Sequence, residues 1–97
     1  MGAAFQIEYS PQAADDLRGM RAFDRAKILR AIDQYLAQAP MHVGKSRIKR
    51  MRQPFWSQYR LRVDEHRVYY NVNEPARVVS VLRILTKGTG LTPGEAP

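Results

Sequence analysis

The sequence predicts an α+β fold of two layers, in which an N-terminal strand and an αα-hairpin pack on a mostly antiparallel β-sheet. Three observations lead to this prediction. Apolar and polar residues alternate near the N-terminus, apolar residues then recur at helical spacing, and three later runs are rich in Val, Tyr, Leu and Ile. The predicted element order is β-α-α-β-β-β, with the helical hairpin covering one face of the sheet.

The first strand and the first helix are marked by adjoining signals. Residues 5–9 alternate apolar and polar side chains with a period of two, which is typical of a half-buried strand. Ser10 followed by Pro11 is a helix-start signal, because the Ser hydroxyl can accept from a free backbone N–H and Pro has none to leave unpaired. A short helix is therefore expected from Pro11 to about Met20.

A second helix is expected after residue 20. Asp24 is the predicted N-cap, and Phe23 before it is placed to pack onto Ile28 as a hydrophobic staple. Apolar residues then recur at helical spacing as far as Ala39, where Pro40 ends the helix. This apolar stripe is typical of a hydrophobic core.

The remaining chain is read as a connector and three strands. Residues 41–54 form a basic connector whose conformation the sequence leaves open. Strands are expected at about 56–63, 66–72 and 77–85, in an antiparallel meander with short turns. The third run is apolar on both faces, so it is expected to lie inside the sheet.

A turn at Asp64-Glu65 would fix the pairing of the first two of these strands. It places Arg62 opposite Arg67 and Arg60 opposite Tyr69 on the face away from the helices. Opposed arginines repel, so an anionic ligand between them is a natural explanation, with Tyr69 as a stacking surface for a base. The alternative is that these are ordinary solvated residues.

Charge separates the two halves of the chain. The net charge is +7, and residues 41–97 carry the whole excess. Such an asymmetry favours a polyanionic partner such as RNA, although an acidic protein would be attracted by the same field and basic residues also aid solubility. The candidate RNA-binding residues lie in the connector: Lys45, Arg47, Lys49, Arg50 and Arg52.

Length and composition limit the remaining possibilities. The 97 residues suffice for one domain, placed at residues 1–87, with residues 88–97 as a flexible C-terminal tail. Cysteine is absent, and His and carboxylates show no ligand spacing, so neither a metal nor another cofactor is expected. There is no signal peptide or membrane span, which predicts a cytoplasmic protein without membrane association.

The segment from Gln58 to Tyr70, Gln-Tyr-Arg-Leu-Arg-Val-Asp-Glu-His-Arg-Val-Tyr-Tyr, resembles the signature of the RelE/ParE toxin superfamily, also known as plasmid stabilisation proteins. Residues 79–84 resemble the closing strand, and the similarity extends over about residues 5–87. The resemblance implies a toxin of a type II toxin–antitoxin module, most simply a RelE-like ribosome-dependent mRNA endoribonuclease that inhibits translation. Its implied partners are a cognate antitoxin, in a hetero-oligomer, and mRNA on the ribosome.

The resemblance also assigns roles to residues. Arg67 falls on the arginine expected to hold the scissile phosphate, Arg60 and Arg62 fall on basic positions of the preceding strand, and Lys87 lies near a further basic position after the last strand. The sequence departs from the family pattern in having no Tyr or His near its C-terminus. Tyr69, His66 and Lys87 are then the candidates for acid–base catalysis.

Two other functions stay open for this reason. One is a ParE-like inhibitor of DNA gyrase, which needs no catalytic residues of its own. The other is a catalytically impaired RNA-binding relic of a toxin.

Overall fold

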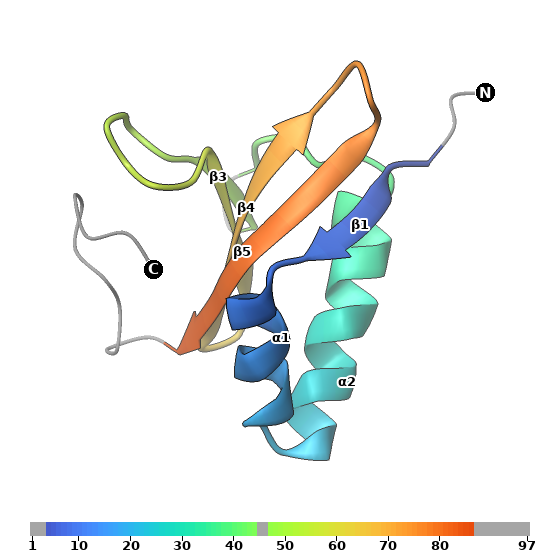
Figure 1. Cartoon of the computed structure of the whole chain (residues 1–97), viewed down its shortest axis with the longest axis vertical. Helices are drawn as coiled ribbons and strands as arrows, with labels where there is room; N and C mark the ends of the chain where they lie inside the picture. Colours follow the sequence, from blue (N-terminus) through green and yellow to red (C-terminus); the bar gives the residue numbers. More distant parts are fainter. Residues whose placement is uncertain (1–3, 45–46, 87–97) are drawn as a thin grey trace.

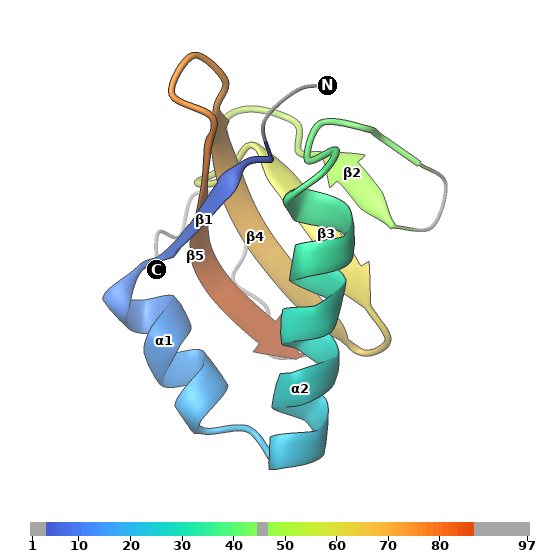
Figure 2. The ribbon, with the colours of Figure 1, turned by 90° about the vertical axis from the view of Figure 1, so that its right-hand side faces the viewer.

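Two helices cover one face of a five-stranded sheet in this computed structural model, which describes residues 4–44 and 47–86 (Figures 1 and 2). The elements in chain order are β1 (Gln6–Tyr9), α1 (Pro11–Arg18), α2 (Ala22–Ala31), the π-helical segment η1 (Ile32–Leu36), β2 (Ile48–Arg50), β3 (Tyr59–Val63), β4 (His66–Asn73) and β5 (Val78–Thr86). The predicted α+β class and helix–sheet layering are confirmed.

The strands lie in the order β1-β5-β4-β3-β2. β1 runs parallel to β5, and the other neighbours are antiparallel. The predicted meander is therefore present as β3, β4 and β5. β5 lies between β1 and β4, which confirms that the run apolar on both faces is an interior strand.

Side chains at the start of α1 form hydrogen bonds with the backbone of β5 beyond the residues that pair with β1. The Ser10 hydroxyl accepts from the backbone N of Ala13 at 3.0 Å, as predicted for an N-cap, and donates to the carbonyl of Leu82 at 2.7 Å. One turn later the Asp16 carboxylate accepts from the backbone N of Ile84 at 2.8 Å. Because β1 pairs with β5 only as far as Val81, these side chains satisfy the exposed edge that follows.

The predicted start of the second helix is wrong. α2 begins at Ala22 with Arg21 as its N-cap, and Phe23 is 76% exposed, so it forms no staple. Asp24 lies within the first turn instead, where its carboxylate accepts from Arg21 Nε at 3.3 Å. The helix also changes to a π-helical turn at η1, a change that no feature of the sequence explains.

The register of the β3–β4 hairpin is confirmed. Arg62 pairs with Arg67 and Arg60 with Tyr69, and the turn lies at Asp64-Glu65. A bulge between Tyr69 and Tyr70 shifts the pairing of β4 with β5. The inner face is buried against the helices, as expected from the alternation of strand side chains.

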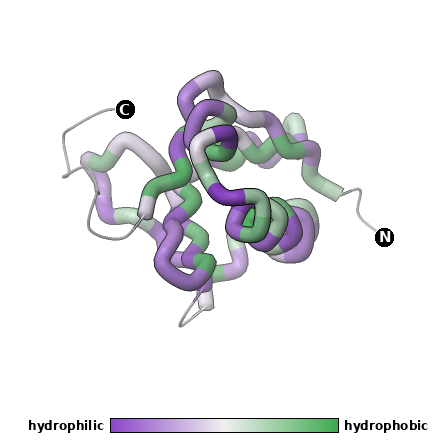
Figure 3. Tube along the Cα trace, turned by 90° about the horizontal axis from the view of Figure 1, so that it is seen from below, coloured by the Kyte–Doolittle hydropathy of each residue, from purple (hydrophilic) through white to green (hydrophobic). Residues whose placement is uncertain are grey.

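The hydrophobic core fills the space between the inner face and the helices. Hydrophobic and hydrophilic residues alternate within single elements along the chain (Figure 3). The Tyr70 hydroxyl in the core donates to the Pro40 carbonyl at 2.6 Å, and burial raises the pKa of this phenol. The fully buried large side chains are Tyr70, Ile28, Ile32, Leu36, Leu61, Val68, Val79 and Val81.

The basic connector contributes a strand that the sequence did not identify. β2 is a short edge strand antiparallel to β3. The strand expected from residue 56 begins only at Tyr59, because Phe55 and Trp56 belong to a loop that stacks on Tyr69. Figure 1 shows this yellow-green loop on the side of the sheet away from the helices.

Within the described ranges, no helix is long and apolar enough to span a bilayer.

Candidate functional site

Cationic side chains from three neighbouring strands gather on the outer face of the sheet. Lys49 of β2 pairs with Arg60 of β3, and Arg62 of β3 pairs with Arg67 of β4. Strand alternation turns all four away from the helices, since their chain neighbours Ile48, Leu61 and Val68 are buried in the core. We call Lys49, Arg60, Arg62 and Arg67 the cationic face.

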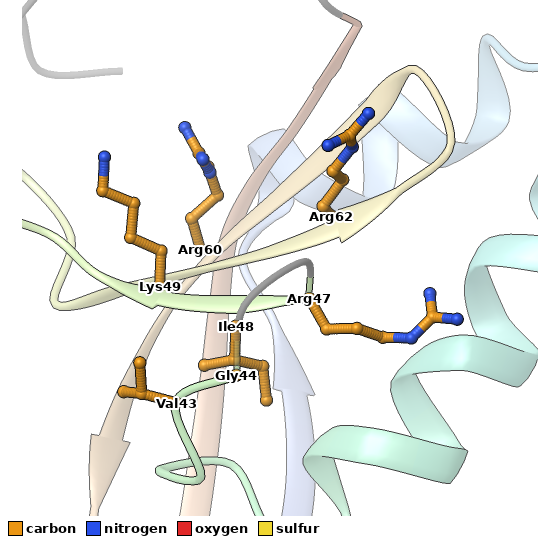
Figure 4. Close-up of a pocket in the computed structure, with 7 residues that line it drawn as sticks. All are labelled: Val43, Gly44, Arg47, Ile48, Lys49, Arg60 and Arg62. Atoms are coloured by element: carbon orange, nitrogen blue, oxygen red, sulfur yellow. The ribbon is translucent and has the colours of Figure 1, made fainter.

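A shallow pocket opens at one end of this face, beside β2. Figure 4 shows Lys49 and Arg60 projecting side by side, with Arg62 further along β3 and Arg47 turned toward the helix. The pocket has a volume of about 140 Å³, and its lining residues, all within the described part of the chain, are Val43, Gly44, Arg47, Ile48, Lys49, Arg60 and Arg62. The lining therefore includes four cations and no acidic side chain.

Arg60 is the most electrostatically unfavourable member of the cationic face. Burial lowers the pKa of its guanidinium, and Arg67 and then Arg62 lower it further, while the neighbouring Tyr69 side chain opposes the shift. Its Nε atom is buried and has no hydrogen-bond acceptor among the described residues. A buried, unsatisfied and repelled cation costs stability, and an anion bound here would remove much of this cost.

Tyr69 does not present the exposed stacking surface that the sequence suggested. It is only 6% exposed, because the loop before β3 lies over it. Trp56 packs on it with ring centroids 4.7 Å apart and Phe55 at 5.8 Å, while Phe55 and Trp56 stack on each other at 4.8 Å. We call Phe55, Trp56 and Tyr69 the aromatic cluster.

The sequence pattern did not reveal the roles of Phe55 and Trp56, which it placed next to or inside a strand. Two adjacent aromatic residues directly after Pro54 were the available signal. Both side chains are partly exposed, so Phe55 and Trp56, and not Tyr69, form the solvent-facing surface of the cluster.

The predicted RNA-binding run divides into different environments. Lys49 joins the cationic face, whereas the guanidinium of Arg47 lies 4.8 Å from the centre of the Tyr35 ring. Arg50 Nη1 donates to the Tyr59 hydroxyl at 3.0 Å and lies over the same ring. Arg52 is exposed in the loop that follows.

Lys45, Lys87 and the tail at residues 88–97 lie outside the described residues.

The candidate His66 lies on the wrong side of its strand to assist the arginines. It alternates with Arg67 and lines a pocket with Arg21 and Lys27 of α2, and its Nδ1 is 3.4 Å from Thr86 Oγ1. Among the described residues, the pocket of the cationic face contains neither a carboxylate nor an imidazole. Residues 4–44 and 47–86 also contain no group of His and acidic side chains arranged to hold a metal ion.

Arg83 of β5 is neutralised locally. Its Nε and Nη2 donate to the two Asp16 carboxylate oxygens at 2.8 and 3.0 Å, and this bidentate contact raises the pKa of Arg83. The arginine is therefore committed to joining β5 to α1. The cationic face is formed by the strands on the other side of β5.

Comparison with solved structures identifies proteins of the same fold. The RelBE2 toxin–antitoxin complex from Mycobacterium tuberculosis matches with a TM-score of 0.75 and 18% identity, over 90% of this chain and 95% of that chain. The RelE–RelB complex from Pyrococcus horikoshii matches with a TM-score of 0.72 and 20% identity, over 90% and 99%. The YoeB–YefM complex from Staphylococcus aureus matches with a TM-score of 0.58 and 22% identity, over 84% and 95%.

No curated protein sequence matches this chain significantly. A family model does, namely the ParE toxin of the type II toxin–antitoxin system, parDE, which matches residues 7–89. The match covers most of the chain and includes both the helical layer and the cationic face. The chain therefore belongs to the ParE toxin family of type II toxin–antitoxin systems, within the RelE/ParE superfamily.

Proposed function

We propose that this toxin binds the phosphate backbone of RNA on its cationic face and acts as a RelE-like, ribosome-dependent mRNA endoribonuclease. The observation that carries the proposal is Arg60, a partly buried guanidinium that is crowded by Arg67 and Arg62 and has an unsatisfied Nε among the described residues. Folding alone gives no reason to collect these charges. A phosphodiester offers the anionic oxygens that forked guanidinium donors match.

The chemistry on this face would be mainly electrostatic. Attack of a 2′-hydroxyl, which gives up its proton to a base, on the adjacent phosphate forms a 2′,3′-cyclic phosphate and breaks the bond to the 5′-oxygen of the next nucleotide, which takes a proton from an acid. Negative charge builds on the phosphoryl oxygens during this step, and Arg67 and Arg62, opposite each other across the β3–β4 pair, would stabilise it. Arg60 and Lys49 would hold the neighbouring backbone. The base and acid of such a reaction would come from Tyr69 or Lys87, which both stay candidates, or from the ribosome.

A cognate antitoxin is the second proposed partner. The structures that share the fold include complexes of a toxin with an antitoxin, from Mycobacterium tuberculosis and Pyrococcus horikoshii among others. An acidic segment of such a partner would be drawn to the same charges that attract RNA. We therefore propose a toxin–antitoxin hetero-oligomer in which toxin activity is suppressed.

A ParE-like inhibitor of DNA gyrase is the competing function. The family match favours it, and so does the lack of a carboxylate or imidazole in the described pocket of the cationic face. This function needs binding only. A toxin-derived RNA-binding module without catalysis would have the same features.

Cleavage mapping of mRNA in a translating extract, beside a gyrase supercoiling assay, separates these functions. We expect cleavage by the wild-type protein, a loss of about 100-fold or more in Arg67→Gln, and little change in supercoiling. Arg30→Gln is the matched control, because Arg30 is exposed on α2 in the helical layer. Full cleavage by Arg67→Gln would overturn the assigned phosphate site, and inhibited supercoiling without cleavage would establish gyrase inhibition as the function.

Salt dependence gives a second measurement. If the four cations of the cationic face each neutralise one phosphate of a single strand, the RNA affinity should fall about 50-fold between about 50 and 200 mM salt. An affinity that changes little over this range would contradict binding through the backbone.

A further inference from the structure

We propose that Phe55 and Trp56 form a base-stacking subsite next to the cationic face, so that the protein reads a single-stranded nucleotide by its base as well as by its phosphate. This inference rests on the proposed function but is separable from it. It also assigns the stacking role to residues other than the buried Tyr69.

The aromatic cluster and the cationic face are joined through Tyr69. Tyr69 pairs with Arg60 in the β3–β4 register, and the two side chains are close enough that Tyr69 raises the pKa of the Arg60 guanidinium against the effect of burial. Trp56 packs on the same tyrosine, with ring centroids 4.7 Å apart. A nucleotide whose phosphate contacts Arg60 therefore lies next to an aromatic surface, because only the Tyr69 side chain separates Arg60 from Trp56.

The two neighbours of Tyr69, Arg60 and Trp56, each carry an unsatisfied donor as well. Within residues 4–44 and 47–86, two buried side-chain nitrogens lack a hydrogen-bond partner, Arg60 Nε and Trp56 Nε1. Buried polar groups are normally satisfied, so two exceptions flanking one ring call for an explanation. A nucleotide supplies acceptors of both kinds, phosphate oxygens for the guanidinium and base carbonyls for the indole N–H, once the side chains that cover these two buried nitrogens move aside.

The arrangement of the rings is what a stacking platform requires. Phe55 and Trp56 stack at 4.8 Å with an interplanar angle of 27°, and both remain partly exposed while Tyr69 supports them from below. Bases of any sequence stack on aromatic surfaces, and proteins that bind single strands combine such surfaces with a positively charged track. The adjacent cations favour a nucleic acid over an uncharged ligand.

Trp56 is the single tryptophan of the chain, so its fluorescence reports directly on the subsite. The full-length protein is titrated with an oligouridylate, with an abasic ribose-phosphate oligomer of the same length, and with a polyglutamate peptide. We expect the oligouridylate to quench Trp56 and to bind at least about fivefold more tightly than the abasic oligomer. Polyglutamate is expected to bind more weakly than either and to leave the fluorescence unchanged.

Phe55→Leu keeps an apolar side chain but removes the ring. In this variant we expect the preference for the oligouridylate over the abasic oligomer to fall at least about twofold below the wild-type value, because one of the two stacking rings is lost. Phe23→Leu is the matched control, because Phe23 is a highly exposed aromatic residue of α2 in the helical layer. It should retain the wild-type preference and the wild-type quenching.

The outcomes distinguish the subsite from the proposed function. Equal binding of the two oligomers by the wild-type protein would overturn the stacking subsite and leave RNA-backbone binding standing. An unaltered preference in Phe55→Leu would overturn it as well. Binding of neither oligomer would overturn both proposals. Tighter binding of polyglutamate with quenching of Trp56 would also overturn both, and it would favour an acidic protein as the ligand of this surface.

Discussion

Replacing Arg60 by methionine should stabilise the protein and weaken its binding to RNA. The guanidinium is partly buried, is repelled by Arg67 and Arg62, and keeps an unsatisfied Nε among the described residues. Methionine retains an apolar chain of similar length while removing the charge and the donors. Function and stability should therefore move in opposite directions at this one position.

The expected size of the effect follows from three contributions. Removing a buried unsatisfied donor recovers about 1–3 kcal/mol, and relieving two like-charge contacts recovers about 0.2–1 kcal/mol each. Losing the favourable interaction with the Tyr69 side chain costs about 0.5–1.5 kcal/mol. These contributions allow a net gain between about 0 and 4.5 kcal/mol, and solvent screening of this only partly buried side chain places the expected gain at the low end, about 1 kcal/mol, which corresponds to a rise in Tm of roughly 4–8 °C for a chain of this size.

Urea unfolding and thermal unfolding measure this gain, provided that the dependence of the unfolding free energy on urea concentration (the m value) is the same in both proteins. Arg30→Met is the control, because Arg30 is exposed on α2, away from the cationic face, and its loss should change the free energy of unfolding by no more than about 0.5 kcal/mol. The gain in Arg60→Met should shrink at high salt, where repulsion is screened. A lower unfolding midpoint in Arg60→Met would refute the reasoning, since Arg60 would then be a net stabilising residue of the free protein.

Two further predictions concern stability. Asp16→Asn should lower the free energy of unfolding by about 1–3 kcal/mol, because a carboxylate that accepts from Arg83 and from the backbone of Ile84 becomes neutral. The control in the same urea titration is Asp15→Asn, which should cost at most about 0.5 kcal/mol because the Asp15 side chain is 70% exposed. Equal losses in the two variants would contradict this role of Asp16. Burial raises the pKa of Tyr70, so the folded state retains a proton that the unfolded chain releases near pH 10, and stability should fall as the pH rises above about 10. Tyr70→Phe should unfold less steeply with pH in that range, and an unchanged pH profile would refute the assignment.

Local signals determined much of this fold from the sequence. Ser10 followed by Pro11 identified the start of α1, and period-two alternation with an Asp64-Glu65 turn identified the register of β3 and β4. Both depend on contacts between residues close in the chain or on alternation that one buried face enforces. The same alternation puts Arg60, Arg62 and Arg67 on one face of the sheet.

Contacts between residues far apart in the chain could not be predicted from the sequence. β2 is a strand only because β3 offers it an edge, and its basic residues carry no strand pattern of their own. Phe55 and Trp56 look like the beginning of a strand, yet they fold over Tyr69 because this buries more aromatic surface on the outer face. In the same way, Asp24 loses its expected capping role once Arg21 starts α2 earlier.

The sequence by itself thus determined the element order and the cationic character of one sheet face, since alternation and charge are properties of the chain. Only the tertiary structure decided which of these cations are free of other contacts and so available to bind an anionic ligand. Pairing with Asp16 commits Arg83, and tyrosines hold Arg47 and Arg50, while burial leaves Arg60 under strain beside the aromatic cluster. Availability depends on neighbours brought together from far apart in the chain, and the linear pattern does not contain that information.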